Sequence, residues 1–186
     1  SSAEKGIQQN PFVEFTSIHI HTANICTAKC VFCPYQQHVD PKSVMDLNLF
    51  KTIIDQYVRL GGDRVYFSPN AGDPLVDPSL TKKAAYARSV GVNYIGMITN
   101  GILLGKKEMY KQLLPLVDNI GISLPGLNRE TYKRLFGVDK ALDVKNNLMA
   151  LAKEKIKKKL NTEILLLFRI DQPFSDIMAD QEMESL

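Results

Sequence analysis

Three cysteines close together near the start of the chain are its best candidates for chemistry. Cys26, Cys30 and Cys33 lie within eight residues, separated by three and then by two residues. Thiolates at this spacing can reach three corners of an iron–sulfur cubane, and thiolate is the ligand that such clusters prefer. Three ligands for four irons leave one iron open to a chelating small molecule.

Two other interpretations of these cysteines remain open at this point. A structural zinc ion closes its shell with four ligands, and His38, five residues after Cys33, could be the fourth. The cysteines could instead be buried and inert, although their clustering in one loop disfavours this. The chain has no other cysteine, and an odd, tightly clustered set is a poor disulfide framework. A reducing, cytoplasmic location is the simplest inference.

The elements that must position this loop alternate between strand and helix. Strands are predicted over residues 15–21, 64–68, 94–99, 119–124 and 162–168. Helices are predicted over residues 47–60, 78–90, 106–114, 128–136, 140–159 and 174–186. Five strands separated by helices indicate right-handed parallel βαβ units, in a sheet that is either doubly wound or curled into a barrel. In both folds the chemistry lies in the loops that follow the C-terminal ends of the strands.

Local patterns support these elements. In residues 47–60 the apolar side chains recur at helical spacing, and Gly61-Gly62 ends the helix. Asp77 can cap the helix that follows the second strand. The continuous apolar run of residues 162–168 suits a strand that is buried on both faces.

The cysteine loop resembles the signature of a known family. Cys-x-x-x-Cys-x-x-Cys, with the aromatic Phe32 directly before the last cysteine, resembles the motif of the radical SAM superfamily. The resemblance extends over roughly residues 15–175. It implies an α/β fold, a partial (β/α) TIM-like barrel of parallel strands that is truncated here after the fifth strand. Residues 1–14 would be an N-terminal lead-in and residues 15–186 the core domain.

For the chemistry, the resemblance implies that Cys26, Cys30 and Cys33 ligate a [4Fe–4S] cluster. The amino and carboxylate groups of S-adenosylmethionine (SAM) would chelate the fourth iron. An electron from a donor such as flavodoxin or ferredoxin would break the S–C5′ bond of SAM. The products would be methionine and a 5′-deoxyadenosyl radical, which takes a hydrogen atom from the substrate. Phe32 would lie beside the adenine, a role that is compatible with a place in the core.

The loop after the second predicted strand resembles a further family motif. Ala71-Gly72-Asp73-Pro74 is similar to the Gly-Gly-Glu-Pro of the family. Glycine lets backbone approach a ligand closely, and a carboxylate suits an ammonium group. Asp73 is therefore expected to bind the SAM amine, with a side chain one methylene shorter than the usual glutamate. Without the cysteines, this segment would be an ordinary Asp-Pro turn.

The next two loops resemble the family as well. Thr99-Asn100-Gly101 ends the third predicted strand and is similar to a Thr-Asn-Gly motif, which places Thr99 and Asn100 near the SAM ribose and methionine. Ser123 ends the fourth strand and, with Arg134, would hold the SAM carboxylate, since a guanidinium matches a carboxylate bidentately. Arg134 could equally be a solvated charge on a helix.

Other polar residues lie where chemistry is expected. Arg169 and Asp171 follow the fifth strand, and Arg169 could bind SAM or a substrate anion, or simply reach solvent. His19 and His21 share one face of the first strand and could line the barrel interior, although such histidines are more often satisfied core or rim residues. Five lysines in residues 153–159 lie late in a predicted helix. Their positive charges interact favourably with the negative end of the helix dipole, and they form a solvated face.

The whole chain is ordinary in its charge and hydrophobicity. It has 186 residues and a formal net charge of +3, too weak to indicate a nucleic-acid partner. No apolar stretch approaches the ~20 residues that span a bilayer. The N-terminus lacks the basic-then-apolar pattern of a secretory signal.

The favoured hypothesis is a radical SAM enzyme that acts on an unidentified peptide, protein or small molecule. Residues 123–126 and 130–132 resemble the branch that carries a cysteine-rich C-terminal extension, called SPASM. No cysteine follows Cys33, so we expect that C-terminal part to be missing here, either because it was cut away or because this protein lacks it. The alternative is a non-catalytic iron–sulfur or zinc-binding module on an α/β scaffold.

Overall fold

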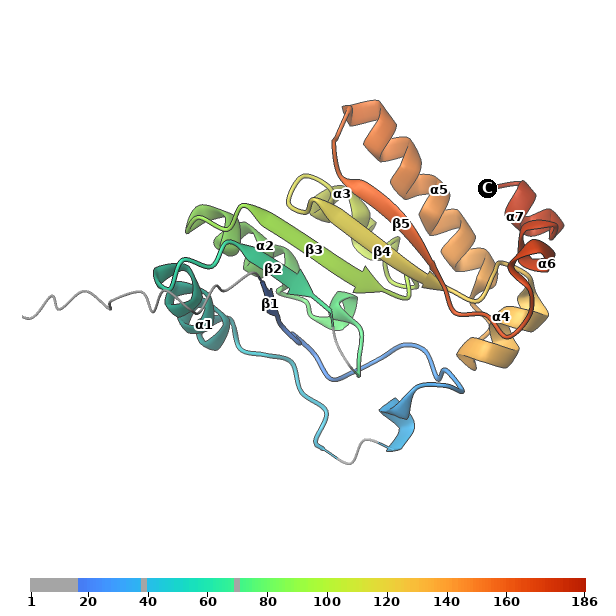
Figure 1. The fold of residues 1–186 in the computed structure, drawn as a ribbon, viewed down its shortest axis with the longest axis horizontal. Coiled ribbons are helices and arrows are strands. Elements are labelled where there is room, and N and C mark those ends of the chain that lie inside the picture. Colours follow the sequence, from blue (N-terminus) through green and yellow to red (C-terminus); the bar gives the residue numbers. More distant parts are fainter. Residues whose placement is uncertain (1–16, 38–39, 69–70) are drawn as a thin grey trace, which may run out of the picture.

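Five parallel strands in a single sheet form the frame of the molecule. The computed structural model describes residues 17–37, 40–68 and 71–186, so the predicted lead-in over residues 1–14 lies outside it. The strands are β1 (Ile18–His19), β2 (Arg64–Phe67), β3 (Tyr94–Thr99), β4 (Asn119–Leu124) and β5 (Glu163–Phe168). They lie side by side in chain order (Figure 1). A doubly wound sheet reverses its order partway, so this order is that of a partial barrel and confirms the predicted fold class.

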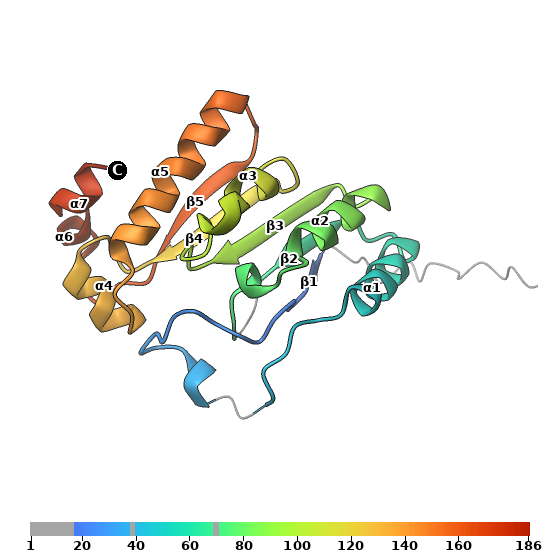
Figure 2. The ribbon, with the colours of Figure 1, turned by 180° about the vertical axis from the view of Figure 1, so that it is seen from behind.

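Helices lie along one face of this sheet and beyond the C-terminal ends of its last two strands (Figure 2). They are α1 (Leu47–Arg59), α2 (Leu80–Ser89), α3 (Met109–Leu113), α4 (Arg129–Phe136), α5 (Ala141–Lys158), α6 (Phe174–Met178) and α7 (Gln181–Glu184). Short 3-10 turns occupy Pro34–Gln37, Pro74–Val76 and Lys106–Glu108. Figures 1 and 2 view the molecule from opposite sides, with α2 and α3 behind the sheet in one and before it in the other. In the described part of the chain, no helix is long and apolar enough to cross a bilayer.

The core lies between the sheet and these helices. Alternate strand residues point into it and are buried: Val65, Phe67, Ile95, Met97, Ile120, Ile122 and Leu124. Phe50 and Ile54 of α1, with Leu148 and Leu151 of α5, belong to the same buried cluster. Burying a side chain of this kind contributes roughly 1.5–3 kcal/mol, so this layer holds the strand ends in a fixed arrangement.

The prediction that the fifth strand is buried on both faces is wrong. Leu165 is 38% exposed, whereas its neighbours Ile164 and Leu166 pack against the core. Among the described residues β5 pairs only with β4, and the helices cover only one face of the sheet. The other face is open, and Ile98 of β3 is 36% exposed on it.

The first strand is shorter than predicted. β1 contains two residues of the predicted span 15–21, of which residues 15 and 16 lie outside the described part of the chain. The amide N–H of Ile20 still donates to the carbonyl of Tyr66 in β2, at 2.8 Å. The chain therefore follows β2 for one more residue before it turns into the cysteine loop.

The second helix begins later than predicted, at Leu80 instead of Pro78. Asp77 is not its cap, because its carboxylate accepts hydrogen bonds from the amide and the hydroxyl of Ser79, at 2.8 and 2.7 Å. These bonds shape a turn before the helix. Asp77 has a further partner, Lys83, described below.

Two other predicted helices are interrupted. Residues 106–114 form a 3-10 turn and then α3, because Lys107 and Glu108 have left-handed backbone with φ of 51° and 52°. Residues 174–186 form α6 and α7 instead of one helix. Asp180 separates them and caps α7 by accepting from the amide of Glu182 at 2.9 Å.

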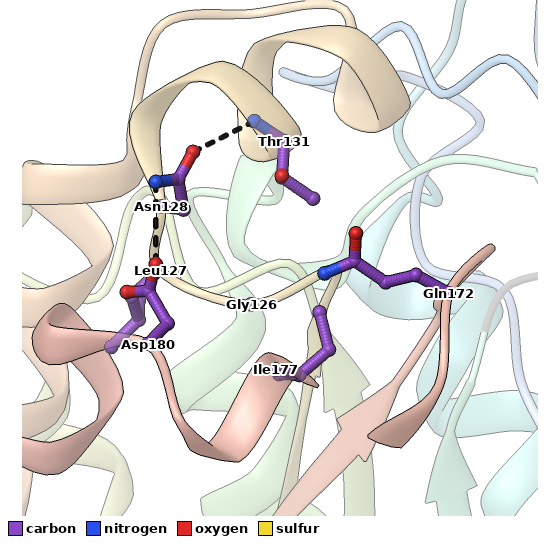
Figure 3. A pocket seen from close by; sticks show the side chains of 7 residues that line it. All are labelled: Gly126, Leu127, Asn128, Thr131, Gln172, Ile177 and Asp180. Carbon is purple, nitrogen blue, oxygen red and sulfur yellow. Dashed lines mark hydrogen bonds between the residues drawn. The ribbon is translucent and has the colours of Figure 1, made fainter. Parts of the chain in front are cut away.

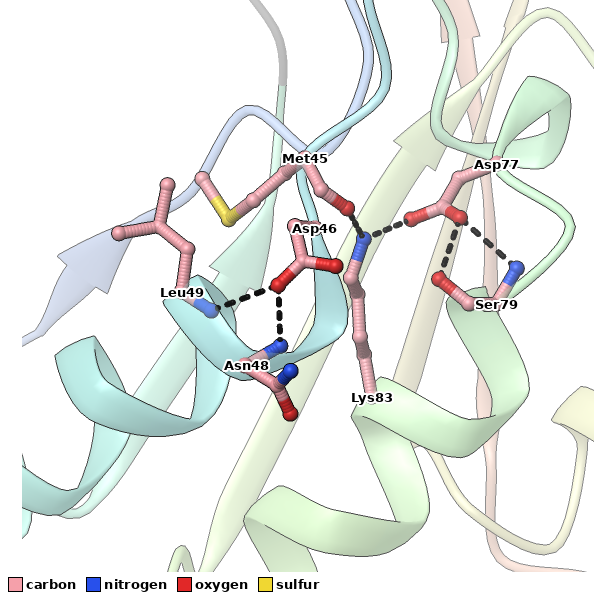
Figure 4. Close-up of polar contacts among 7 residues, drawn as sticks. All are labelled: Met45, Asp46, Asn48, Leu49, Asp77, Ser79 and Lys83. Carbon is pink, nitrogen blue, oxygen red and sulfur yellow. Dashed lines mark hydrogen bonds and ion pairs between the residues drawn. The ribbon is translucent and has the colours of Figure 1, made fainter.

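A buried ion pair ties α2 to the segment that leads from the cysteine loop into α1 (Figure 4). The Nζ of Lys83 lies 2.5 Å from the Asp77 carboxylate and 2.5 Å from the carbonyl oxygen of Met45. Both charged side chains are fully buried. The amide of Met45 in turn donates to the carbonyl of Thr22 at 2.7 Å, so the pair anchors the base of the cysteine loop.

Candidate functional site

The cysteine loop is held on one side by the C-terminal end of α4. The amide of Lys29 donates to the carbonyl of Phe136 and that of Val31 to the carbonyl of Leu135, both at 2.9 Å. The last carbonyls of a helix have no partner within the helix, so the loop amides satisfy them. Gly137 ends α4 with a φ of 67°, and a side chain there would lie 2.4 Å from the Lys29 carbonyl oxygen.

The loop after β2 holds the cysteine loop on the other side. The amide of Asp73 donates to the carbonyl of Ile25 at 2.8 Å. Gly72 has a φ of 118°, and a Cβ at this position would lie 2.4 Å from the backbone oxygen of Ala23. The close backbone approach predicted for this glycine is therefore made to the cysteine loop.

The cysteine loop and the strand ends enclose a cavity of about 240 Å³. It is lined by Cys26, Ala28, Cys30, Phe32, Cys33, Ser68, Gly72, Asp73, Ile98, Thr99, Asn100, Ser123, Phe136 and Arg169. These residues come from the cysteine loop, from α4, and from the C-terminal ends of β2, β3, β4 and β5 or the loops that follow. This edge of the sheet is where parallel α/β folds carry their chemistry.

Eight of the nine predicted site residues line this cavity, and Arg134 does not. Its guanidinium forms a two-point ion pair with Asp171, in which both side chains are about half exposed. The guanidinium lowers the pKa of the Asp171 carboxyl below its ordinary value. Arg169, which the sequence left between a ligand role and solvent, is the arginine on the cavity wall.

The carboxylate of Asp73 is buried and bonded within the protein. Its oxygens lie 2.8 and 3.0 Å from the hydroxyl of Thr99, and they accept from the amides of Asn100 at 2.8 Å and Leu75 at 2.9 Å. Burial raises the pKa of Asp73 to about 6, and these hydrogen bonds limit the rise. The carboxylate therefore joins the loops that follow β2 and β3.

Burial also raises the pKa values of the Cys26 and Cys30 thiols, that of Cys30 to about 12. The next causes for Cys30 are the charges of Cys26 and Cys33, so the three sulfur groups lie within electrostatic reach of one another. Thiols in this environment stay protonated near neutral pH. A bound metal centre reverses the preference, because its positive charge deprotonates the thiols that coordinate it.

The three cysteines fit an iron–sulfur cluster in ligand type and in location, because all three line one cavity. Within residues 17–37, 40–68 and 71–186, no group of three or more Cys, His, Asp or Glu side chains is arranged to hold a metal ion. The hydroxyl of the fully buried Tyr132 has no hydrogen-bond partner among these residues. After burial, Cys30 contributes most to its raised pKa, so this donor lies near the cysteine loop.

The two histidines of the first predicted strand are exposed and flank the buried Ile20, as alternation predicts. The His19 ring stacks on Tyr66, with ring centroids 4.9 Å apart, and its Nδ1 lies 2.6 Å from the hydroxyl of the cavity residue Ser68. His38, the alternative zinc ligand, lies outside the described residues.

Sequence reasoning missed several cavity residues, among them Ile98 and Phe136. Ile98 lies two positions before Asn100, so strand alternation could have placed it on the open face. Phe136 comes from the end of α4 and packs edge-to-face on Phe32, with ring centroids 5.9 Å apart. No local pattern indicates this contact, because it depends on how α4 docks against the cysteine loop.

A second cavity, of about 190 Å³, lies between the start of α4 and the C-terminal helices (Figure 3). It is lined by Gly126, Leu127, Asn128, Thr131, Gln172, Ile177 and Asp180. Asn128 caps α4 through the amides of Glu130 and Thr131, and its side-chain nitrogen lies 3.3 Å from Asp180. These polar groups thus bond to one another, and none of the predicted site residues lines this cavity.

Comparison with known proteins gives relatives that are longer than this chain. A probable GTP 3′,8-cyclase of Saccharolobus islandicus (strain M.14.25 / Kamchatka #1) is 26% identical over 122 residues, which cover 66% of this chain and 39% of that protein. The GTP 3′,8-cyclase of Chlorobaculum tepidum is 27% identical over 159 residues, which cover 80% and 44%. The chain therefore spans about two fifths of the length of the curated relatives it matches.

Solved structures share the fold. BtrN in complex with AdoMet and 2-DOIA matches with a TM-score of 0.60 and 20% identity, over 88% of this chain and 58% of BtrN. Histidine-tagged anSMEcpe with bound AdoMet matches with a TM-score of 0.66 and 20% identity, over 82% of this chain and 43% of anSMEcpe. Identity at this level shows the fold alone.

The family is shown by a separate match. The family model described as the radical SAM superfamily matches residues 20–180, which include the cysteine loop, the strand ends around the cavity and nearly all of the described chain. The chain therefore belongs to the radical SAM superfamily, whose members bind a [4Fe–4S] cluster and SAM.

Proposed function

We propose that the protein holds a [4Fe–4S] cluster through Cys26, Cys30 and Cys33 and cleaves SAM reductively, giving a 5′-deoxyadenosyl radical that abstracts hydrogen from a substrate. One observation carries the proposal. The three thiols share a single cavity with the residues that end four neighbouring strands. A non-catalytic metal module needs the thiols but has no use for the strand ends.

The cavity residues suggest how SAM is held. Phe32, on the cavity wall beside Phe136, suits the adenine. Thr99 and Asn100 suit the ribose and methionine portions, and the hydroxyl of Ser123 suits the carboxylate. The Asp73 carboxylate already has partners within the protein, so its contact with the SAM amine requires it to exchange one of them.

Two arginines are candidates for binding the carboxylate of SAM. Arg134 matches the family motif but pairs with Asp171, whereas Arg169 lines the cavity. Substitution of each by methionine distinguishes them, because loss of the carboxylate partner should weaken SAM binding at least tenfold. Equilibrium binding of SAM to each variant, with its cluster intact, is the measurement.

For the substrate, the electron donor and the location, the proposal rests on family membership rather than on the cavity. The proposed substrate is a peptide, protein or small molecule, and a reduced flavodoxin or ferredoxin would supply the electron. Membership of the SPASM branch, residues 15–186 as the core domain and a cytoplasmic location are parts of the same proposal.

Anaerobic reconstitution tests the proposed function. The purified protein should take up four irons and four sulfides and should release 5′-deoxyadenosine when SAM and dithionite are added. Substitution of Cys30 by alanine should abolish cluster assembly, while Lys140→Met, at a half-exposed side chain that pairs with Asp143, should leave it unchanged. Binding of a single zinc ion, with no 5′-deoxyadenosine above background, would favour the non-catalytic module.

A further inference from the structure

The turn that follows β3 reaches the cysteine loop through one side chain. The Nδ2 of Asn100 lies 3.6 Å from the Sγ of Cys26, within hydrogen-bond distance for sulfur, and 3.1 Å from the hydroxyl of Thr27. Asn100 is 7% exposed, so water competes little for these contacts. The contact joins residues that are 74 positions apart in the chain.

The orientation of this carboxamide is set by a second hydrogen bond. The Oδ1 of Asn100 accepts from the amide of Ile102 at 3.0 Å. An amide oxygen only accepts and an amide nitrogen only donates, so the Ile102 N–H selects the oxygen for its own side. The NH₂ group is therefore the one that faces Cys26.

The backbone of Asn100 is held by Asp73 and Thr99. The Asn100 amide donates to a carboxylate oxygen of Asp73 at 2.8 Å, and the Thr99 hydroxyl lies 2.8 Å from the same oxygen. The Asp73 amide bonds the carbonyl of Ile25, the residue before Cys26. One buried carboxylate residue thus fixes both partners of the contact between Asn100 and Cys26.

A hydrogen-bond donor at this position would change the reduction potential of an iron–sulfur cluster. Reduction adds negative charge, and hydrogen bonds to the cysteine sulfurs stabilise that charge and raise the reduction potential. The amide of Ala28 also donates to the Cys26 sulfur, at 3.4 Å, but only proline would remove this backbone donor, and its ring would also constrain the loop. Asn100 supplies a side-chain donor, which can be removed.

We infer that Asn100 donates a hydrogen bond to the Cys26 thiolate and thereby raises the reduction potential of the cluster, with Asp73 and Thr99 as its positioning residues. The inference rests on the proposed function, because it requires a cluster at Cys26. Asn100 would then have a role in electron transfer in addition to its place on the wall of the cavity beside the cysteine loop.

The test is a redox titration of the reconstituted protein without SAM, followed by electron paramagnetic resonance. In Asn100→Ala the ratio of reduced to oxidised cluster at a fixed potential should fall roughly tenfold, which is about 59 mV for a one-electron couple. Asn147→Ala is the matched control. Its amide holds the same turn by donating to the carbonyls of Gly101 and Ile102, at 2.9 and 3.1 Å, and these bonds do not involve a cysteine sulfur.

Thr99 provides a second pair of variants in case Asn100→Ala assembles no cluster. Thr99→Val removes the hydroxyl that lies against Asp73 and should lower the potential, whereas Thr99→Ser keeps the hydroxyl and should preserve it. Iron and sulfide are counted in every sample. Full clusters with unchanged potentials in Asn100→Ala and Thr99→Val would overturn the inference alone. Failure of the unsubstituted protein to assemble a cluster would overturn the proposed function, and the inference with it.

Discussion

At Gly72 the backbones of two loops come closer than any side chain permits. Gly72 has a φ of 118°, and the space where a Cβ would stand is occupied by the backbone oxygen of Ala23, 2.4 Å away. Backbone cannot move aside as a flexible side chain can, so the contact depends on glycine. It sets the distance between the cysteine loop and the loop that carries Asp73.

Substitution of Gly72 by alanine should therefore destabilise the protein more than its φ alone explains. Gly91→Ala is the control, because Gly91 has a similar φ of 107° but its Cβ would meet only a Val58 methyl at 3.8 Å. We expect Gly72→Ala to lose roughly 1–3 kcal/mol more than Gly91→Ala, the usual penalty of overpacking. Chemical denaturation measures both losses, and equal values would contradict a backbone clash at Gly72.

Asp73 gives the metal-free protein a pH-dependent stability. Its pKa is about 6 in the folded state against an ordinary value of 3.8, so folding favours the protonated carboxyl. That contribution is fully present below about pH 4 and is lost as the pH rises through about 6. Relative to Asp73→Asn, which does not titrate, the protein should lose about 3 kcal/mol in total as the pH rises from below 4 to well above 6. Urea denaturation across this range checks it, and parallel stability curves would show that the pKa is not raised.

Among the elements, helix α2 is held in position by the buried ammonium group of Lys83. In most helices such a group is exposed to solvent. Lys83 and Asp77 are both fully buried, and the Met45 carbonyl completes the site of the ammonium group. Removal of one member of a buried pair leaves the other charged and unpaired, which is costly, whereas removal of both can be nearly neutral. The pair therefore makes the packing of α2 against the base of the cysteine loop specific.

Lys83→Met should destabilise the protein by about 3–5 kcal/mol, and the double variant Lys83→Met/Asp77→Asn should recover part of that loss. Lys140→Met is the control, because Lys140 and its partner Asp143 are about half exposed and such pairs contribute about 0–1 kcal/mol. Thermal unfolding of the set provides the comparison. A double variant less stable than Lys83→Met would show that the two charges do not act as a pair.

Element positions were predictable where the local pattern was decisive. β3 and β4 have the predicted bounds because turn residues flank both strands. The α4 helix begins after Asn128, whose side chain accepts from the amides of Glu130 and Thr131 as a cap should. Asp77 has the same capping chemistry, but the Ser79 hydroxyl and the buried ammonium group of Lys83, six residues later, take its oxygens, and the burial of that lysine depends on tertiary packing.

At the scale of the whole molecule, the edge strand β5 differs from the central strands of the sheet in its pairing and its exposure. β3 is paired on both sides, whereas β5 is paired only with β4 among the described residues. Leu165 leaves part of β5 in contact with solvent. Backbone hydrogen bonds near solvent open at lower free energy than those in the centre of a sheet.

Hydrogen exchange should therefore be slowest in β3 and β4 and faster in β5. Mass spectrometry of peptic peptides from the metal-free protein at neutral pH resolves these strands. Peptides from α5, which covers β5 on its packed face, serve as the internal reference. Exchange in β5 as slow as in β3 would mean that a further part of the protein or a partner covers that edge.

The sequence by itself determined the ligand chemistry and the class of fold. Three thiols separated by three and then by two residues, and strands that alternate with helices, are local features of the amino-acid sequence. Phe32 and Ser123 could be placed at the site for the same reason, since each follows from its position in a motif or at a strand end.

Only the tertiary structure decided which groups meet. It turned the Asp73 carboxylate onto Thr99, set the Asn100 amide against Cys26, paired Arg134 with Asp171 and left Arg169 on the cavity wall. These partners are far apart in the chain, and their choice depends on how loops pack at the end of the sheet. At the buried Asp73 and Asn100 the choice is exclusive, because a polar group without water must bond to the neighbour that packing supplies.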